Sequence, residues 1–181
     1  VIELMSETLS GIPSIIYGLF GMIFFVVFLK WDYSLLAGAA TAAIMVLPTI
    51  LSTTKEALDS VPDSYREGSF ALGTGKLRTI FKVVLPAAVP GILSGIILAI
   101  GRIVGETAAL LYTSGTATRG LTKGLMSSGR TLAVHMYTIS SEGFHTKQTF
   151  ATAVILLIFV FIINTLSSVV AKQISKKAGG Q

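Results

Sequence analysis

The sequence predicts an all-α membrane protein, a bundle of helices that crosses the bilayer several times. Of its 181 residues, 52% are apolar and only 13% are charged, whereas a typical soluble domain carries about 25% charged residues. The mean hydropathy is +0.77. Four apolar runs approach the ~20 residues that cross a bilayer as a helix, and we expect spans at about 12–29, 35–54, 87–112 and 150–171 within one domain, 1–181.

The predicted spans differ in their side chains, which indicates where each one packs. The first contains Gly18 and Gly21, and the second is rich in alanine and glycine between Ala37 and Ala43. Helices in lipid approach one another closely through small residues, since lipid supplies no hydrophobic drive for their association. We therefore expect the second span to be buried in the bundle and the Phe-, Leu- and Ile-rich span 150–171 to face lipid.

A charged loop, 55–86, separates the second and third spans. Ser64-x-x-Glu67 has the form of a capping box at the start of a helix, and Gly73 suits a left-handed cap at its end. From Lys76 to Leu85 apolar residues recur with the period of an amphipathic helix. The loop is therefore predicted to hold two short helices.

The placement of Lys and Arg indicates the orientation. Eight of these residues fall in the 55–86 loop and in the tail after Ala171, and five lie on the other side of a four-span protein. The positive-inside rule therefore favours a cytoplasmic loop and a cytoplasmic C-terminus. The 113–149 segment is then external; it is rich in Gly, Ser and Thr, and an amphipathic or a re-entrant structure stays open for it.

Composition also excludes several kinds of site. The net charge of +5 is explained by basic residues beside apolar spans, so no nucleic-acid partner is expected and membrane lipid is the natural neighbour. The chain has no cysteine, and His135 and His145 lack a third ligand at metal spacing, so neither a metal nor a cofactor is expected. Because the chain opens on Val-Ile-Glu-Leu, we expect it to be the carboxy-terminal part of a longer protein.

A basic and an acidic residue, Arg102 and Glu106, stand inside the third predicted span. Each such charge costs roughly 2.5–3.5 kcal/mol on insertion scales, and the i,i+4 spacing places both on one helix face. Two interpretations stay open: a structural ion pair that holds the bundle, or the lining of a path for an anion in which Glu106 positions Arg102. Arginine suits oxyanions because its planar fork donates two parallel hydrogen bonds. Gly101 and Gly105 leave room beside the pair for a solute or a close helix.

The loop carries an ordered pattern: Glu67-Gly68-Ser69, three residues, Gly73, nine residues, then Val83-Val84-Leu85-Pro86. This pattern resembles the EAA loop of ABC-transporter permeases, in which Glu-Ala-Ala, Gly and Ile-x-Leu-Pro have the same spacing. The resemblance implies that 64–73 docks in a groove of a cytoplasmic ATPase. The coupling residues that it implies are Ser64, Glu67, Gly68, Ser69, Gly73, Leu85 and Pro86.

The chain is not expected to be an enzyme. Gly73-Thr74-Gly75-Lys76 lacks the full phosphate-binding pattern, because Phe70 and Leu77 stand where that pattern needs Gly and Ser or Thr. The chain is therefore not expected to bind ATP by that route, and the resemblance implies that a partner ATPase carries out the hydrolysis of ATP.

Three further segments narrow the resemblance. Arg102-Ile103-Val104-Gly105-Glu106-Thr107-Ala108-Ala109-Leu110-Leu111 is similar to the Arg-x-x-Gly-Glu-Thr-Ala-Pro-Leu-Leu segment of phosphate-specific permeases, with Ala109 in place of Pro. Segments 9–21 and 132–137 resemble the same subfamily, and Ala after Glu-Thr favours its A-type subunits over its C-type subunits.

This resemblance implies a MetI-like helical bundle in the plasma (inner) membrane that imports phosphate, with Arg102 and Glu106 on the path. It also implies the partners: a homologous C-type permease subunit, two copies of a cytoplasmic ATPase and an external phosphate-binding protein. The alternatives are a permease for another oxyanion, such as molybdate or sulfate, and an ion channel or secondary transporter without an ATPase.

Overall fold

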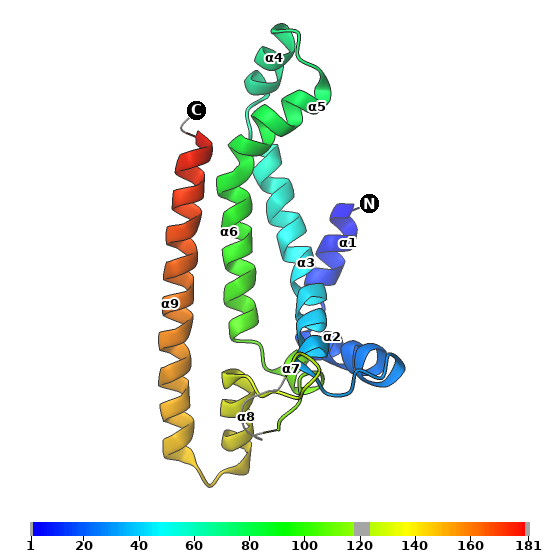
Figure 1. Ribbon diagram of the computed structural model, residues 1–181, viewed down its shortest axis with the longest axis vertical. Helices are drawn as coiled ribbons and strands as arrows, with labels where there is room; N and C mark the ends of the chain where they lie inside the picture. The colour runs from blue at the N-terminus through cyan, green and yellow to red at the C-terminus, as the bar shows by residue number, and fades with distance from the viewer. Residues whose placement is uncertain (1, 118–123, 180–181) are drawn as a thin grey trace.

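The computed structural model describes residues 2–117 and 124–179, and every regular element in these ranges is a helix (Figure 1). The first elements are α1 (Ile2–Ser10), α2 (Ser14–Gly21), the π-helical η1 (Met22–Phe28) and α3 (Leu35–Asp59). The charged loop holds α4 (Asp63–Ala71), α5 (Lys76–Thr79) and the π-helical η2 (Ile80–Val84). The remaining elements are α6 (Leu85–Val104), α7 (Ala108–Leu111), α8 (Leu132–Glu142) and α9 (Thr146–Gly179).

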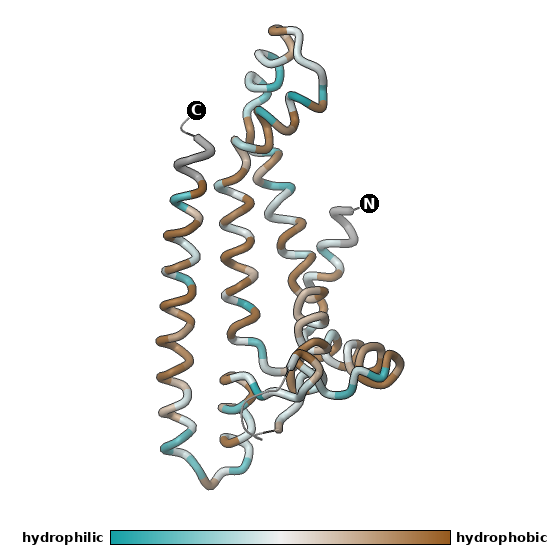
Figure 2. The backbone as a smooth tube through the Cα atoms, viewed as in Figure 1, coloured by the Kyte–Doolittle hydropathy of each residue, from teal (hydrophilic) through white to brown (hydrophobic). Residues whose placement is uncertain are grey.

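Three long apolar helices form the body of the structure. Leu35–Asp59, Lys76–Val104 and Thr146–Ile174 are each long and apolar enough to cross a membrane. They lie side by side with α6 in the middle, and apolar residues dominate most of their length (Figures 1 and 2). The second and fourth predicted spans lie within the first and last of these helices, and the third, 87–112, overlaps Lys76–Val104 only as far as Val104.

The first predicted span, 12–29, is shorter than the sequence suggested. Its helical part is Ser14–Phe28, which at about 1.5 Å per residue covers about 22 Å, less than the ~30 Å of a bilayer core. The helix starts late because Pro13, in an extended conformation, caps it. Figure 1 shows that it runs across the direction of the long helices rather than along them.

Small residues determine how closely α3 and α6 approach. A Cβ atom added at Gly91 on α6 would lie 2.6 Å from the Cβ of Ala57 on α3, so the contact requires glycine. The predicted burial of the second span is confirmed, because 39% of the apolar window of α3 is buried inside the structure. None of the corresponding window of α9 is buried, which leaves that helix free to face lipid as expected.

The segment after α7, for which the sequence left two options, folds back on the start of α3. Backbone carbonyls of Leu125 and Ser127 accept hydrogen bonds from the N–H groups of Leu36 and Leu35, at 2.9 and 3.0 Å. These donors lie in the first turn of α3, where a helix has no partner of its own for them. The chain then forms α8, which ends at the left-handed Gly143 with φ 73°. The segment between α7 and α8 thus caps the N-terminal turn of α3, and α8 then leads to α9.

The capping box predicted at Ser64 and Glu67 is wrong. Helix α4 begins at Asp63, its cap is Pro62, and no side chain makes the cap hydrogen bond. The structure replaces the box with contacts from Arg66, described below. The left-handed conformation predicted for Gly73 at the end of this helix is confirmed: it has φ 77° and follows Leu72, the C-terminal cap of α4.

The second helix of the loop is not separate from the third span. Helices α5, η2 and α6 run as one continuous helix, Lys76–Val104. Pro86 has no N–H for the carbonyl four residues back, and its ring presses against that carbonyl. The wider π turn η2, Ile80–Val84, lies just before Pro86 and absorbs this mismatch. Leu85 and Pro86 therefore lie inside a long helix rather than at a loop boundary.

Candidate functional site

An open groove with a volume of about 760 Å³ lies among the three long helices. Arg102 projects from the last turn of α6 and is solvent-exposed in this chain. Its only hydrogen bond in the described part of the chain is a long one, 3.5 Å from Nη1 to the Thr49 hydroxyl of α3. Most of the guanidinium donors therefore stay available. The groove is lined by Thr49, Ser94, Ile97, Leu98, Gly101, Arg102 and Asn164.

The polar groups of the groove come from three different helices. Thr49 lies on α3, Ser94 and Arg102 on α6, and Asn164 on α9. The Ser94 hydroxyl donates to the carbonyl of Pro90 at 3.0 Å. Among the residues that the structure describes, no Asp or Glu lines the groove. One positive charge and several neutral hydrogen-bonding groups thus face an open space, an arrangement suited to an anion.

Glu106 does not pair with Arg102, contrary to the expectation from their spacing. Helix α6 ends at Val104 with Gly105 as its cap, so the two residues do not share a helix face. The Glu106 carboxylate instead accepts a hydrogen bond from the backbone N–H of Ala109 at 3.1 Å. Among the residues described, the ion pairs are Lys55–Asp59 and Arg66–Asp63. The structural ion pair considered for Arg102 and Glu106 is therefore not formed.

The two glycines beside Arg102 differ. A Cβ atom at Gly101 would lie 3.2 Å from Oδ1 of Asn164, so this position accommodates a close helix. Nothing lies within 4 Å of a Cβ at Gly105. Gly105 instead ends α6 and starts the turn that carries Glu106 to the first turn of α7.

The variant Glu106→Gln is expected to unfold at close to the wild-type temperature, because the glutamine side-chain oxygen still accepts the Ala109 N–H. Glu106→Ala removes this acceptor, and loss of such a cap costs about 1 kcal/mol, so we expect weaker folding. Thermal unfolding of both variants provides the measurement. A loss of stability in Glu106→Gln as large as that in Glu106→Ala would instead indicate a role for the negative charge itself.

The residues that the sequence assigned to the coupling loop do not all face the same way. Ser64, Glu67, Gly68 and Gly73 are exposed, whereas Ser69 is buried, with 7% of its surface exposed. Ser69 is therefore not available for close approach by a partner. Large apolar side chains that the motif does not include are exposed on the same loop: Tyr65, Phe70, Leu72, Leu77 and Phe81.

Three hydroxyl groups form hydrogen bonds that connect α4 to the start of the long helix Lys76–Val104. The Ser69 Oγ lies 2.5 Å from the Thr74 Oγ1 and 2.9 Å from the Thr79 Oγ1. The Thr74 and Thr79 hydroxyls lie 3.0 Å apart, and Thr74 also donates to the Ser69 carbonyl at 2.7 Å. The hydroxyl cluster, Ser69, Thr74 and Thr79, therefore joins α4, the turn after it and α5.

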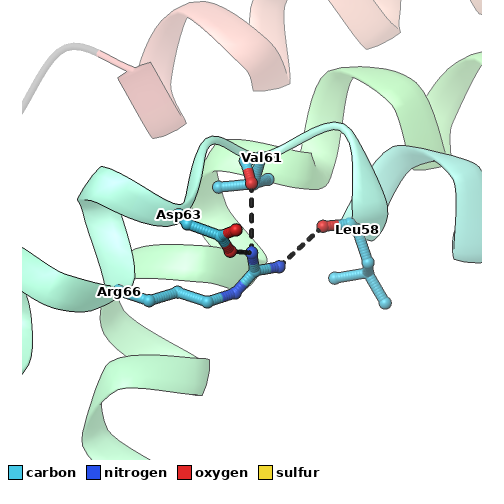
Figure 3. Close-up of polar contacts among 4 residues, drawn as sticks. All are labelled: Leu58, Val61, Asp63 and Arg66. Atoms are coloured by element: carbon cyan, nitrogen blue, oxygen red, sulfur yellow. Dashed lines mark hydrogen bonds and ion pairs between the residues drawn. The ribbon is translucent and has the colours of Figure 1, made fainter.

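Arg66 fastens α4 to α3 on its other side (Figure 3). Its Nη2 donates to the carbonyl of Leu58 at 3.0 Å, and its Nη1 donates to the carbonyl of Val61 at 3.1 Å and to Asp63 Oδ1 at 2.6 Å. The carbonyl of Leu58 belongs to the last turn of α3, where helices leave such groups without partners. Sequence reasoning missed Arg66, although Asp63 three residues before it was a local signal. Helix α4 is thus attached to both α3 and α5.

The histidines take no part in a cluster of metal ligands. Within the part of the chain that the structure describes, no three His, Asp or Glu side chains come together. The His135 Nδ1 lies 3.0 Å from Nη1 of Arg130, and Arg130 Nε donates to the carbonyl of Thr116 at 2.9 Å. The predicted external residues Arg119 and Lys123 lie outside the described residues.

Several known proteins are similar to this chain. A family model described as "Binding-protein-dependent transport system inner membrane component" matches residues 1–179. The phosphate transport system permease protein PstA of Yersinia pestis is 38% identical over 173 residues, covering 94% of this chain and 58% of that protein. The protein PstA 2 of Mycobacterium bovis is 38% identical over 158 residues, covering 87% of this chain and 52% of that protein. The chain thus spans about half the length of the curated relatives it matches.

A solved structure shares the arrangement of the helices. A chain of the MetNI methionine ABC transporter in inward-facing conformations matches with a TM-score of 0.73 and 21% identity. The match covers 94% of this chain and 73% of that chain. The likeness concerns the fold alone, and it confirms the predicted all-helical membrane bundle.

Proposed function

This chain belongs to the family of binding-protein-dependent transport system inner membrane components, and from this membership we propose that it forms part of the path of an ATP-driven phosphate importer. The observation that carries the proposal is the groove at Arg102, which presents a positive charge and neutral hydrogen-bonding groups without a carboxylate. Relatives named as phosphate transport system permeases support phosphate as the solute.

Arg102 is proposed to contact the solute directly, through the fork of its guanidinium. Glu106 contributes to the path in a different way, by holding the turn between α6 and α7 through the Ala109 N–H. The alternatives of a channel or a secondary transporter are less favoured, because neither class needs a docking helix for an ATPase. Helix α4 has the features of such a helix: it is exposed, and hydrogen bonds attach it to both α3 and α5.

The charged loop is proposed to receive the movement of a cytoplasmic ATPase. Exposed Glu67 and Gly68 on α4 and the apolar side chains around them offer a docking surface. The partners that follow are two copies of the ATPase, a homologous C-type permease subunit and an external phosphate-binding protein. In this arrangement ATP hydrolysis belongs to the ATPase and not to this chain. The loop and the end of α9 lie at the same end of the bundle (Figure 1), as a shared cytoplasmic location requires.

The cycle that we propose is alternating access within a single permease domain. Closure of the ATPases moves α4, and α4 carries α3 and α6 with it through Arg66 and the hydroxyl cluster. Since Lys76–Val104 is one continuous helix, the movement of its loop end reaches the turn that bears Arg102. The groove then changes the side of the membrane to which it opens.

The variant Gly73→Arg, in the assembled transporter, tests the coupling. Gly73 has φ 77° and is exposed, so an arginine there is strained and adds bulk at the docking surface. We expect the ATPase to be lost in a pull-down and ATP-dependent uptake of radiolabelled phosphate to stop. Gly73→Asn is the control, because asparagine tolerates the left-handed conformation. Full association and transport by Gly73→Arg would contradict coupling through this loop.

A further inference from the structure

Asn164 is placed unusually for a side chain of α9. It follows an apolar stretch, 153–163, in a helix whose apolar window is not buried at all inside this chain. A polar amide in such a helix is costly unless it has a partner. Asn164 is half-buried, lines the groove, and lies against Gly101 of α6, one residue before Arg102.

The amide of Asn164 has both its donor and its acceptor available. In the part of the chain that the structure describes, no hydrogen bond of this side chain is formed, and its neighbour Gly101 offers no side chain to bond with. A hypothetical Cβ at Gly101 would lie 3.2 Å from Oδ1 and 3.6 Å from Nδ2. The absence of a side chain at residue 101 therefore allows the amide to sit beside the guanidinium-bearing turn.

Thr49, across the groove, differs from four other threonines of the long helices. Thr41, Thr53, Thr152 and Thr165 each donate their hydroxyl to the carbonyl four residues earlier, at 2.7–2.9 Å. Among the described residues, Thr49 makes no such bond, and its oxygen instead receives the long bond from Arg102. Its hydroxyl hydrogen is thus free to donate into the groove.

We propose that Asn164 makes this groove selective for a tetrahedral oxyanion that carries a hydroxyl oxygen, such as phosphate, over fully deprotonated oxyanions such as sulfate and molybdate. The inference rests on the proposed function, because it concerns the same solute path. Arg102 and Thr49 donate to the charged oxygens of the anion. Oδ1 of Asn164 accepts the hydroxyl hydrogen of the anion, while Nδ2 donates to a neighbouring oxygen.

The chemistry of the solutes explains the selectivity. Phosphate near neutral pH keeps at least one P–OH group, whereas sulfate and molybdate offer only acceptor oxygens. An amide has one donor group and one acceptor, so it pairs with both atoms of an HO–P–O unit but with only one kind of atom in sulfate. A site built to bond a solute hydroxyl disfavours the analogue that lacks it, because its own polar atom is left unpaired. Among the described residues that line the groove, no carboxylate is present to accept the hydroxyl hydrogen of the anion in place of Asn164.

The experiment uses the assembled transporter in vesicles and measures uptake of radiolabelled phosphate in competition with arsenate or sulfate. Arsenate resembles phosphate and keeps a hydroxyl, whereas sulfate does not. For Asn164→Leu we expect lower phosphate uptake. The inhibition constant of sulfate, divided by the apparent dissociation constant of phosphate, should fall about tenfold, because about one hydrogen bond that favours phosphate is lost. Inhibition by arsenate relative to phosphate should be unchanged.

Two further variants make the test specific. Thr49→Val removes the hydroxyl that donates to the anion and accepts the long bond from Arg102, but it removes no acceptor for the hydroxyl of the anion, so phosphate and sulfate should both bind more weakly with their ratio unchanged. Thr165→Val alters a nearby threonine of α9 that does not line the groove, and it should behave like the wild type. If the wild type takes up no phosphate, the proposed function itself fails. If the wild type takes up phosphate but Asn164→Leu keeps the wild-type sulfate-to-phosphate ratio, only the role of Asn164 is overturned.

Discussion

Replacement of Arg102 by alanine is expected to reduce phosphate uptake by about 30-fold or more. Among the described residues, the guanidinium is the only positive charge that lines the groove, and loss of one member of a close charge pair costs about 2–5 kcal/mol, which corresponds to about 30-fold to several thousand-fold. The measurement is uptake of radiolabelled phosphate by the assembled transporter in vesicles. Equal amounts of variant and wild type in the membrane must be verified.

Arg102→Lys distinguishes charge from geometry. Lysine keeps the charge but not the planar fork that binds two oxygens at once, so we expect uptake between those of the wild type and Arg102→Ala. Arg78→Ala, on the exposed face of α5, controls for general loss of a basic residue. Wild-type uptake by both Arg102 variants would remove Arg102 from the path.

Replacement of Arg66 by methionine is expected to lower the phosphate transported per ATP hydrolysed by about tenfold. The change removes two hydrogen bonds to the carbonyls of Leu58 and Val61, each contributing about 1 kcal/mol to the docked arrangement of α4. Methionine keeps the length and apolar character of the side chain. The readout is the ratio of uptake to ATPase activity in reconstituted vesicles, because the ATPase should still bind.

Asp63→Asn is the matched control for Arg66. The Asp63 side chain is 82% exposed, and exposed ion pairs contribute little, so this variant should transport nearly as well as the wild type. If Asp63→Asn lowered the ratio as much as Arg66→Met, the ion pair rather than the carbonyl contacts would be responsible. An unchanged ratio in Arg66→Met would show that α4 does not need its attachment to α3.

The sequence predicts the long helices of this chain well where an apolar run is also long enough to cross a membrane. Three of four predicted spans are long helices, and Gly73 takes the left-handed conformation that its place after α4 requires. The first predicted span, 12–29, is helical only over Ser14–Phe28, because apolar composition says nothing of how a chain turns and the helix starts only after Pro13. The contact between 125–127 and the start of α3 joins backbone groups, which leave no mark in a hydropathy pattern.

The sequence predicts only part of the candidate site. Arg102 stands out because a charge in an apolar run is rare, but Thr49 and Asn164 are ordinary residues of distant segments that gain importance only when α3 and α9 meet α6. The pairing of Arg102 with Glu106 assumed an unbroken helix, and Gly105 ends that helix between them. Two residues at i and i+4 lie on the same face only if both belong to one continuous helix.

The unbroken helix Lys76–Val104 also has a consequence for the size of the movement that transport requires. Its 29 residues extend about 43 Å at about 1.5 Å per residue. A tilt of about 5° then displaces one end relative to the other by about 4 Å, with every hydrogen bond along that length left intact. A small rotation of this helix is thus magnified by its length into a step comparable with the size of a small ion.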